Sequence, residues 1–302
     1  MKRQIFTILF LFGGMLVSFS AQRIEVIDLR LVKEAGSESF HPKFTPDGKT
    51  ILLSGEDYAG LKSFDIATGQ VRVLTTGAGA GWQPAISDDS RTVTVRQTDF
   101  SQTPLGERQV YAIDMDNAQM QRVTAQVTDE VPLSVLRNGA TLSTRRQATE
   151  TRPVVYINQD LKLAVERNGQ TTVLTPNGAD ENYLWASLSP DGTRIAYFVM
   201  SLGYAFVSDL NGNVLANLGR NFHALQWINN EWLVGMDDKD NGRVVVESNI
   251  VAVTADGKIR QNLTQPGNGK IEMYPAVSPD GNQIAFHTMA GELYIMEISV
   301  QR

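Results

Sequence analysis

The chain has 302 residues, with 27 basic and 33 acidic residues and a formal net charge of -6. It contains no cysteine, which excludes disulfides, thiolate zinc sites, cysteine nucleophiles and acylation of a lipoprotein cysteine. The acidic balance argues against a nucleic-acid-binding protein, because such a protein needs a basic face to neutralise phosphates. By length, the chain is either two ordinary domains or one large all-β domain.

The first twenty residues have the pattern of a secretory signal peptide. Lys2 and Arg3 precede an uncharged, mostly apolar run over residues 5–17, and Ser18 and Ser20 supply the small residues of a cleavage site. The alternative is a membrane anchor, but a helix of about 13 residues reaches only about 20 Å, short of the roughly 30 Å hydrocarbon core. We therefore expect residues 1–20 to be a signal peptide, residues 21–302 to be one domain, and the protein to be periplasmic or secreted.

A short repeat recurs along the rest of the chain. Residues 41–48, 185–192 and 274–281 each end in Thr/Ser-Pro-Asp-Gly, and an apolar run follows each copy. Residues 83–90 form a degenerate copy, and residues 133–139 and 223–230 form weaker ones. Pro sets φ at the first turn position, Asp bonds the local backbone and Gly supplies a positive φ, so each copy predicts a β-hairpin.

Two further strand-like runs follow each of the first five copies. They cover residues 61–66 and 70–74, 108–113 and 121–124, 161–166 and 171–174, 204–208 and 214–218, and 249–253 and 258–263. Four strands in roughly 47 residues is typical of a β-propeller blade. The sixth copy supplies only three strands, the last over residues 292–298, whereas residues 23–29 form a spare strand before the first copy.

The sequence therefore predicts an all-β, six-bladed β-propeller of four-stranded blades. The N-terminal strand is expected to become the outermost strand of the last blade, which closes the ring and covers a free edge. An open solenoid or a two-sheet sandwich is the alternative, but neither explains why a missing last strand is matched by a spare first one.

The turns at residues 45–48, 189–192 and 278–281 resemble the repeat of the TolB-type, WD-like propeller family. The resemblance covers most of residues 22–302, with the second, third and fifth copies degenerate. It implies a six-bladed propeller. For function it implies less, because this propeller serves envelope scaffolds, peptidase accessory domains and some sugar-active enzymes. The resemblance also implies a binding role, because the family's best-known exported members bind other proteins through the propeller face.

One end of the inner strands gathers side chains suited to binding. The alignment places His41 and His223 at one repeat position, at the start of an inner strand, and His287 at the end of a second strand, so all three are expected on one face. Such a face suits a protein-binding site, and the alternative is packing between blades. The expected binding face comprises His41, Gln83, Trp185, His223, Tyr274 and His287, with an acidic rim of Glu38, Asp129, Glu130, Asp180, Glu181 and Glu272.

The chain has no Gly-x-Ser-x-Gly nucleophile motif, Walker motif or dinucleotide-binding glycine motif. We therefore expect a non-catalytic, monomeric, exported module without a cofactor that binds a protein or peptide in the cell envelope. The acidic rim favours a basic partner and salt-dependent association. The alternative is a metal-dependent sugar-active enzyme similar to propeller polysaccharide lyases, whose three-histidine, one-glutamine inventory is matched by His41, His223, His287 and Gln83, since imidazole suits transition metals.

Overall fold

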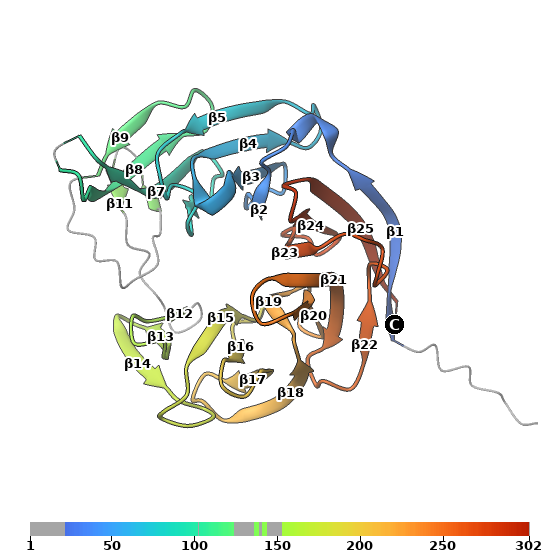
Figure 1. Ribbon diagram of the computed structural model, residues 1–302. Coiled ribbons are helices and arrows are strands. Elements are labelled where there is room, and N and C mark those ends of the chain that lie inside the picture. The colour runs from blue at the N-terminus through green and yellow to red at the C-terminus, as the bar shows by residue number, and fades with distance from the viewer. Residues whose placement is uncertain (1–21, 102, 124–135, 139–140, 144–152, 302) are drawn as a thin grey trace, which may run out of the picture.

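The computed structural model describes residues 22–101, 103–123, 136–138, 141–143 and 153–301. Figure 1 shows the fold along the axis of a ring of blades, as the sequence predicts: an all-β, six-bladed propeller of antiparallel blades. The described helices are two short 3₁₀ turns, Lys33–Ala35 and Glu56–Tyr58. The predicted signal peptide over residues 1–20 lies outside the described residues.

Five four-stranded sheets each run from an inner strand at the axis to an outer strand at the rim. Blade one is β2 (Phe40–Phe44), β3 (Thr50–Ser54), β4 (Leu61–Asp65) and β5 (Val71–Thr75), and blade two is β6 (Ala85–Ile86), β7 (Thr92–Asp99), β8 (Glu107–Asp114) and β9 (Met120–Arg122). Blade four is β15 (Tyr183–Leu188), β16 (Arg194–Val199), β17 (Tyr204–Asp209) and β18 (Val214–Arg220), and blade five is β19 (His223–Trp227), β20 (Trp232–Asp240), β21 (Val245–Thr254) and β22 (Arg260–Asn262). Blade six is β23 (Glu272–Val277), β24 (Gln283–Thr288), β25 (Leu293–Gln301) and β1 (Arg23–Leu31).

Three strands of the third blade are described. β12 (Val154–Ile157), β13 (Leu163–Arg167) and β14 (Gln170–Leu174) form a three-stranded sheet, which confirms the two outer strands predicted at residues 161–166 and 171–174. β10 (Leu136–Asn138) and β11 (Thr141–Ser143) pair with each other in a separate two-stranded sheet. The predicted inner strand of this blade falls partly outside the described residues, and β12 was not predicted.

The N-terminal strand closes the ring, as predicted. β1 pairs antiparallel with β25 from Arg23 opposite Gln301 to Leu31 opposite Tyr294, so the two described ends of the chain lie side by side. Ile24 is only 1% exposed and packs in a core cluster with Trp232 and Met296. The side chain of Gln261, on β22 of blade five, both accepts a hydrogen bond from the backbone N–H of Ile24 and donates one to its carbonyl.

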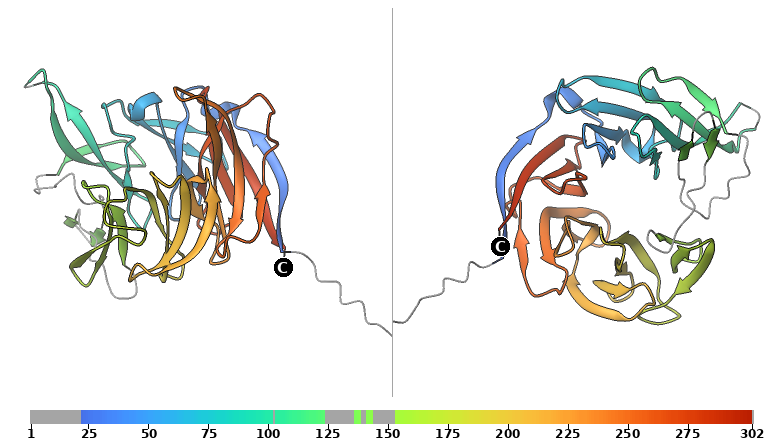
Figure 2. Two further views of the ribbon diagram at one scale, coloured as in Figure 1. Left: turned by 60° about the horizontal axis from the view of Figure 1, so that its bottom comes forward. Right: turned by 180° about the vertical axis from the view of Figure 1, so that it is seen from behind.

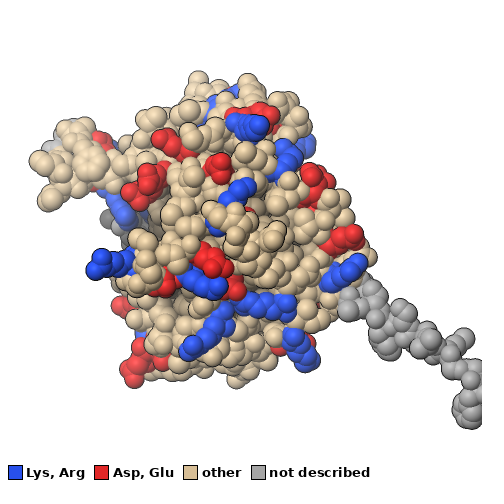
Figure 3. Space-filling model, turned by 45° about the vertical axis from the view of Figure 1, so that its right-hand side comes forward, with Lys and Arg blue, Asp and Glu red and all other residues tan. Residues whose placement is uncertain are grey.

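Basic and acidic side chains are interspersed on the side of the molecule that Figure 3 shows.

Hydrophobic clusters fill the spaces between neighbouring blades. One cluster joins blades five and six, a second joins blades four and five, and others join blades six and one, one and two, and three and four. Each blade therefore needs its neighbours to bury its two apolar faces. Stability is shared around the ring, which makes closure by β1 important.

The Pro-Asp-Gly turns repeat one hydrogen-bonded design at the end of the blades opposite the predicted binding face. In blade four, the Ser189 hydroxyl donates to Asp191 Oδ1 at 2.6 Å and accepts the N–H of Arg194 at 2.9 Å. Gly192 has φ of 72°, the left-handed value that favours glycine there. The blade-one and blade-six turns bond in the same way.

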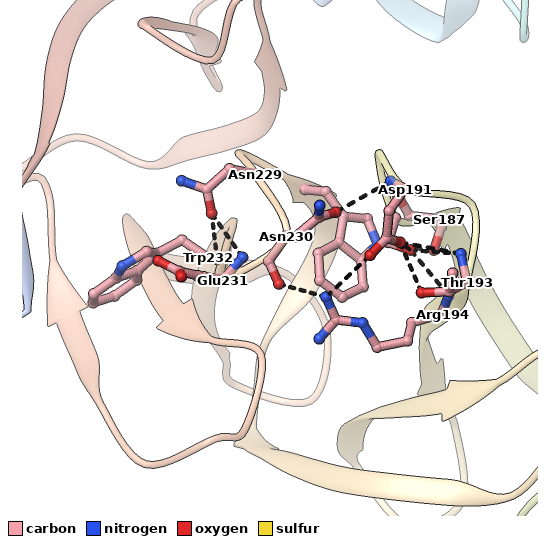
Figure 4. Close-up of polar contacts among 10 residues, drawn as sticks. Ser187, Asp191, Thr193, Arg194, Asn229, Asn230, Glu231 and Trp232 are labelled. Atoms are coloured by element: carbon pink, nitrogen blue, oxygen red, sulfur yellow. Dashed lines mark hydrogen bonds and ion pairs between the residues drawn. The ribbon is translucent and has the colours of Figure 1, made fainter. Parts of the chain in front are cut away.

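Neighbouring turns are also tied to each other, as Figure 4 shows for blades four and five. The N–H of Asp191 donates to Asn230 Oδ1 at 3.1 Å, and the Arg194 guanidinium donates to the Asn230 carbonyl at 2.6 Å. In blade five the turn is held by Asn229 instead, whose Oδ1 accepts hydrogen bonds from the backbone N–H groups of Glu231 and Trp232. This turn is one residue shorter than that of blade four, because four rather than five residues separate its strands.

The turn carboxylates predict an acid-sensitive fold. Partial burial acts to raise the pKa of Asp191, but hydrogen bonds from Ser189 and Thr193 outweigh it and hold the pKa below its usual value. A lowered carboxyl pKa stabilises the fold above the unfolded pKa near 4, and this contribution is lost as the pH falls through the folded pKa. Asp191→Asn should therefore flatten the fall in melting temperature between about pH 5 and pH 2. The exposed Asp160→Asn is the control, and an unchanged profile for Asp191→Asn would contradict the prediction.

Candidate functional site

A left-handed residue marks the start of the inner strand in four blades. His41, Gln83, Trp185 and Tyr274 have φ between 46° and 52°. In blades one, four and six the pairing register shifts by one residue at this point, which is a β-bulge. Non-glycine residues rarely hold a positive φ, and bulges often re-aim side chains at functional sites. The repeat therefore places a distinct side chain at the same end of each of these inner strands.

The prediction that His223 shares this repeat position was wrong by one residue. In blade five the left-handed residue is Ala224, with φ of 48°. His223 pairs with Met236, and its counterparts by register are Phe40, Leu184 and Met273. The cause is the shorter turn of blade five, which shifts an alignment anchored on that turn by one residue. His223 still lies at the same end of its blade.

A continuous group of rings lies over blades one, two and six at this end. We call it the mouth cluster, and it consists of Phe40, His41, Tyr58, Trp82, Tyr274 and His287. The His41 ring stacks on Tyr58 with centroids 4.0 Å apart, and Tyr58 meets Trp82 edge-on at 4.7 Å. The centroid of His41 also lies 4.8 Å from that of Tyr274 and 5.2 Å from that of His287. The structure thus brings three of the predicted residues together.

A second group forms across blades four and five. The Trp185 ring centroid lies 5.0 Å from that of His223, which also meets Phe198 edge-on at 4.3 Å. His223 Nδ1 hydrogen-bonds to Asp238 Oδ1. The charge of Asp238 acts on Tyr274, so it links this group to the mouth cluster. Gln83 is exposed at the start of its strand.

Several polar tips of the mouth cluster have no partner within the described part of the chain. His41 Nδ1 is 3.0 Å from the Ser54 hydroxyl, but its Nε2 makes no hydrogen bond. His287 Nδ1 donates to the Thr288 carbonyl at 2.9 Å, and its buried Nε2 has no partner. The Tyr58 hydroxyl makes no hydrogen bond either. The half-buried tips of His41 and Tyr58 are therefore available to a ligand, whereas the tip of His287 is covered by the protein.

Burial keeps the two neighbouring histidines neutral. Desolvation, with the nearby His287, lowers the pKa of His41 to about 4. Desolvation likewise lowers the pKa of His287 to about 4, and burial raises the pKa of Tyr58 to about 12. At neutral pH the mouth cluster is therefore an uncharged aromatic surface with hydrogen-bonding tips.

Because these histidines are neutral in the folded protein, we predict a second, milder dependence of the free energy of unfolding on pH. The unfolded chain binds protons on His41 and His287 near pH 6.5, whereas the folded chain binds them near pH 4, so stability falls as the pH drops between these values. The chain has only 3 histidines, so NMR can follow each imidazole. We expect His287 to titrate near pH 4 and His287→Phe to reduce the loss of stability in this window. A midpoint near 6.5 for His287 would contradict this.

The predicted acidic rim is only partly present. Glu272 is 3% exposed, and its carboxylate accepts hydrogen bonds from Thr264 and Asn268, so it is a buried strand-end residue rather than a rim residue. Asp129 and Glu130 lie outside the described residues. Glu38 and Asp180 are exposed and Glu181 is half-buried, its carboxylate bonded by Ser201.

The structure does not bring His41, His223 and His287 into one metal site. Across residues whose positions are described, no group of three or more His, Asp or Glu side chains is arranged to hold a metal ion. His223 bonds to Asp238, whereas His41 and His287 contact each other among aromatic rings. The three-histidine arrangement expected for the alternative enzyme is therefore wrong for these residues.

The sequence analysis missed Phe40, Tyr58, Trp82 and Asp238, together with a set of exposed apolar loops. The loops join the second and third strands of their blades and lie at the same end as the mouth cluster. Figure 2 shows the β7–β8 hairpin projecting beyond the ring, away from the described termini. Its Leu105 is 92% exposed. The loop residues, which we call the apolar loop tips, are Phe100, Leu105, Met200, Leu202, Val244 and Met289.

No protein-family model and no curated protein sequence matches the chain. Among solved structures, TolB from Acinetobacter baumannii is similar at 19% identity with a TM-score of 0.54, over 80% of this chain and 57% of that one. This chain thus spans little more than half the length of that TolB. The putative TolB from Agrobacterium tumefaciens is similar at 13% identity with a TM-score of 0.51, over 93% and 99% of the two chains.

A third similar structure is U3-55K, at 11% identity with a TM-score of 0.60, over 90% of this chain and 99% of that one. Identities this low show the fold and leave the function to be argued from the site. The ring of six blades, the repeated turns and these likenesses agree: the chain has the six-bladed β-propeller fold of TolB proteins.

Proposed function

We propose that this protein is an exported binding module that holds a protein or peptide partner on the mouth cluster. The observation that carries the proposal is the uncharged group of rings at one end of the inner strands, with polar tips that no described residue uses. Aromatic side chains with a free hydrogen-bonding atom contribute most to binding at protein interfaces.

The apolar loop tips support a macromolecular partner over a small ligand. They lie at the same end of the blades as the mouth cluster, with exposed side chains such as Leu105 and Met289, while the opposite end carries polar Asp-Gly turns. Exposed apolar groups gathered on one face are typical of an interaction surface. A partner that covers both the centre and the loops would bury an area in the range of a specific interface.

The exposed acids at this end favour basic groups at the edge of the partner. Glu38, Glu56, Asp57 and Asp180 lie on loops there and are exposed. Charges of this kind speed up association more than they add affinity, and salt screens them. The partner we propose therefore has an apolar or aromatic centre with basic residues around it.

Export and a monomeric state belong to the same proposal. Residues 1–20 have the pattern of a signal peptide, and the fold is that of TolB proteins. Within the described ranges, no helix is long and apolar enough to cross a membrane. N-terminal sequencing of the secreted protein should begin at Ala21.

A peptide selection tests the proposed function. The exported chain is immobilised and exposed to a pool of N-acetylated random nonapeptides, and mass spectrometry identifies those retained. We expect enrichment of peptides with aromatic or apolar residues, and slower association at 0.5 M than at 0.05 M salt. Retention of no peptide at either salt concentration would count against a peptide-binding face.

A further inference from the structure

Lys43 is a cation on an inner strand, close to the mouth cluster. It lies on the inner strand β2, two residues after His41. Its neighbours Pro42 and Phe44 are buried, whereas Lys43 is exposed. Successive side chains on a strand point to opposite sides, so Lys43 points away from the packing between blades and toward the channel that the inner strands line.

Among the described residues, the ammonium group of Lys43 has one hydrogen-bond partner. Its Nζ donates to the carbonyl oxygen of Pro84 at 2.6 Å, at the start of the inner strand of blade two. No ion pair joins it to a carboxylate in the ranges that the structure describes. An ammonium group has three N–H donors, so two have no partner in the part of the chain that the structure describes.

The described residues at the same level of the other inner strands are uncharged. By register, its counterparts on the other described inner strands are Ala85, Ser187, Gln226 and Ala276. The one carboxylate on those strands, Glu272, is buried and bonded by Thr264 and Asn268. Although solvent reaches Lys43, the surrounding protein desolvates it and lowers its pKa. Because solvent reaches Lys43 and no described carboxylate pairs with it, an anion can approach its ammonium group.

We propose that Lys43 binds a carboxylate of the peptide or protein that the mouth cluster holds. This inference rests on the proposed function and names one polar group that the partner carries beside its apolar contacts. The two N–H donors without a described partner match the two oxygens of a carboxylate. A single ammonium balances one negative charge, which favours a carboxylate over a doubly charged phosphate. Two residues of strand separate His41 from Lys43 by about 7 Å, so one short extended segment can contact both.

The carboxylate can be a chain terminus or an acidic side chain, and the test separates the two. Three pools of N-acetylated random hexapeptides are offered to the exported chain. The first pool has a free C-terminal carboxylate and no Asp or Glu, the second has a C-terminal amide with Asp and Glu included, and the third has an amide and no acid. We expect at least about tenfold more retention from one of the first two pools than from the third. The pool from which more peptide is retained identifies the source of the carboxylate.

Two variants of Lys43 connect that preference to its charge. Lys43→Met should abolish the preference for carboxylate peptides, and Lys43→Arg should keep it. Lys43→Met should also change the melting temperature by no more than about 2 °C, because the side chain is exposed and loses one hydrogen bond to a described residue. If Lys43 served only to tie blade one to blade two, Lys43→Met would instead lower the melting temperature by more than this and leave the peptide preference unchanged.

The outcomes separate this inference from the proposed function. Equal retention from all three pools, unchanged in Lys43→Met, would overturn carboxylate binding and leave the peptide-binding face intact. Retention from none of the pools would overturn both. Acetate titrated alone provides a further check, since it should shift the NMR signal of the Lys43 side chain saturably in the wild type. A shift that grows linearly with the acetate concentration would contradict specific binding of a carboxylate at Lys43.

Discussion

Trp82→Ala is expected to weaken binding of the selected peptides at least tenfold, or by about 1.4 kcal/mol or more. Trp82 forms the outer end of the mouth cluster, edge-on to Tyr58 at 4.7 Å, and it is 44% exposed in the free protein. Its truncation removes a large aromatic contact from the partner but little packing from the blades. The free energy of unfolding should therefore change by no more than about 1 kcal/mol. Calorimetric titration and urea unfolding measure the two effects.

The control for this prediction is Val173→Ala. Val173 is 52% exposed on β14, the outer strand of the third blade, so it offers an exposed apolar side chain far from the inner strands. Its replacement should leave the dissociation constant unchanged. Equal affinity for the wild type and Trp82→Ala would refute the mouth cluster as the binding surface. Trp82 is a sharper probe than Trp185 or Tyr274, because those two are half-buried and their loss would also disturb packing.

Deletion of residues 22–31 is expected to abolish cooperative unfolding of the propeller. The deletion removes the whole of β1, leaves the long edge of β25 unpaired, and exposes the cluster that Ile24 shares with Trp232 and Met296. An exposed strand edge of this length also promotes aggregation. Thermal unfolding followed by circular dichroism should show a broad transition at lower temperature, with aggregation in light scattering.

Two point variants separate packing from pairing in this strand. Ile24→Ala removes a side chain that is 1% exposed and should lower the free energy of unfolding by about 2 to 4 kcal/mol. Ile27→Ala, at a position 59% exposed on the same strand, should change it by less than about 0.5 kcal/mol. A deletion variant that melts as sharply as the wild type would show that the ring does not depend on its closing strand.

The candidate site was predicted in part. The repeat alignment identified His41, Trp185 and Tyr274 because the inner strand of each blade begins at a fixed distance from its turn. The same alignment misplaced His223, since the blade-five turn is shorter by one residue and nothing in the sequence reveals where that residue is lost. Tyr58 and Trp82 were missed because they come from loops outside the repeat, and loops meet only when the blades are assembled. Glu272 was taken for a rim acid because charge alone does not reveal burial.

The repeat pattern in the sequence was sufficient to establish the architecture of this protein. Each Pro-Asp-Gly turn fixes its own hairpin through bonds within a few residues, such as those from Ser189 to Asp191 and Arg194, and the count of strands required residues 23–29 to close the ring. The tertiary structure alone decided the chemistry of the face. Desolvation of His41, His287 and Lys43 depends on atoms supplied by several blades, and the mouth cluster joins residues as far apart as Tyr58 and Tyr274. Turn geometry is local in the chain, whereas burial and electrostatics depend on every neighbour in space.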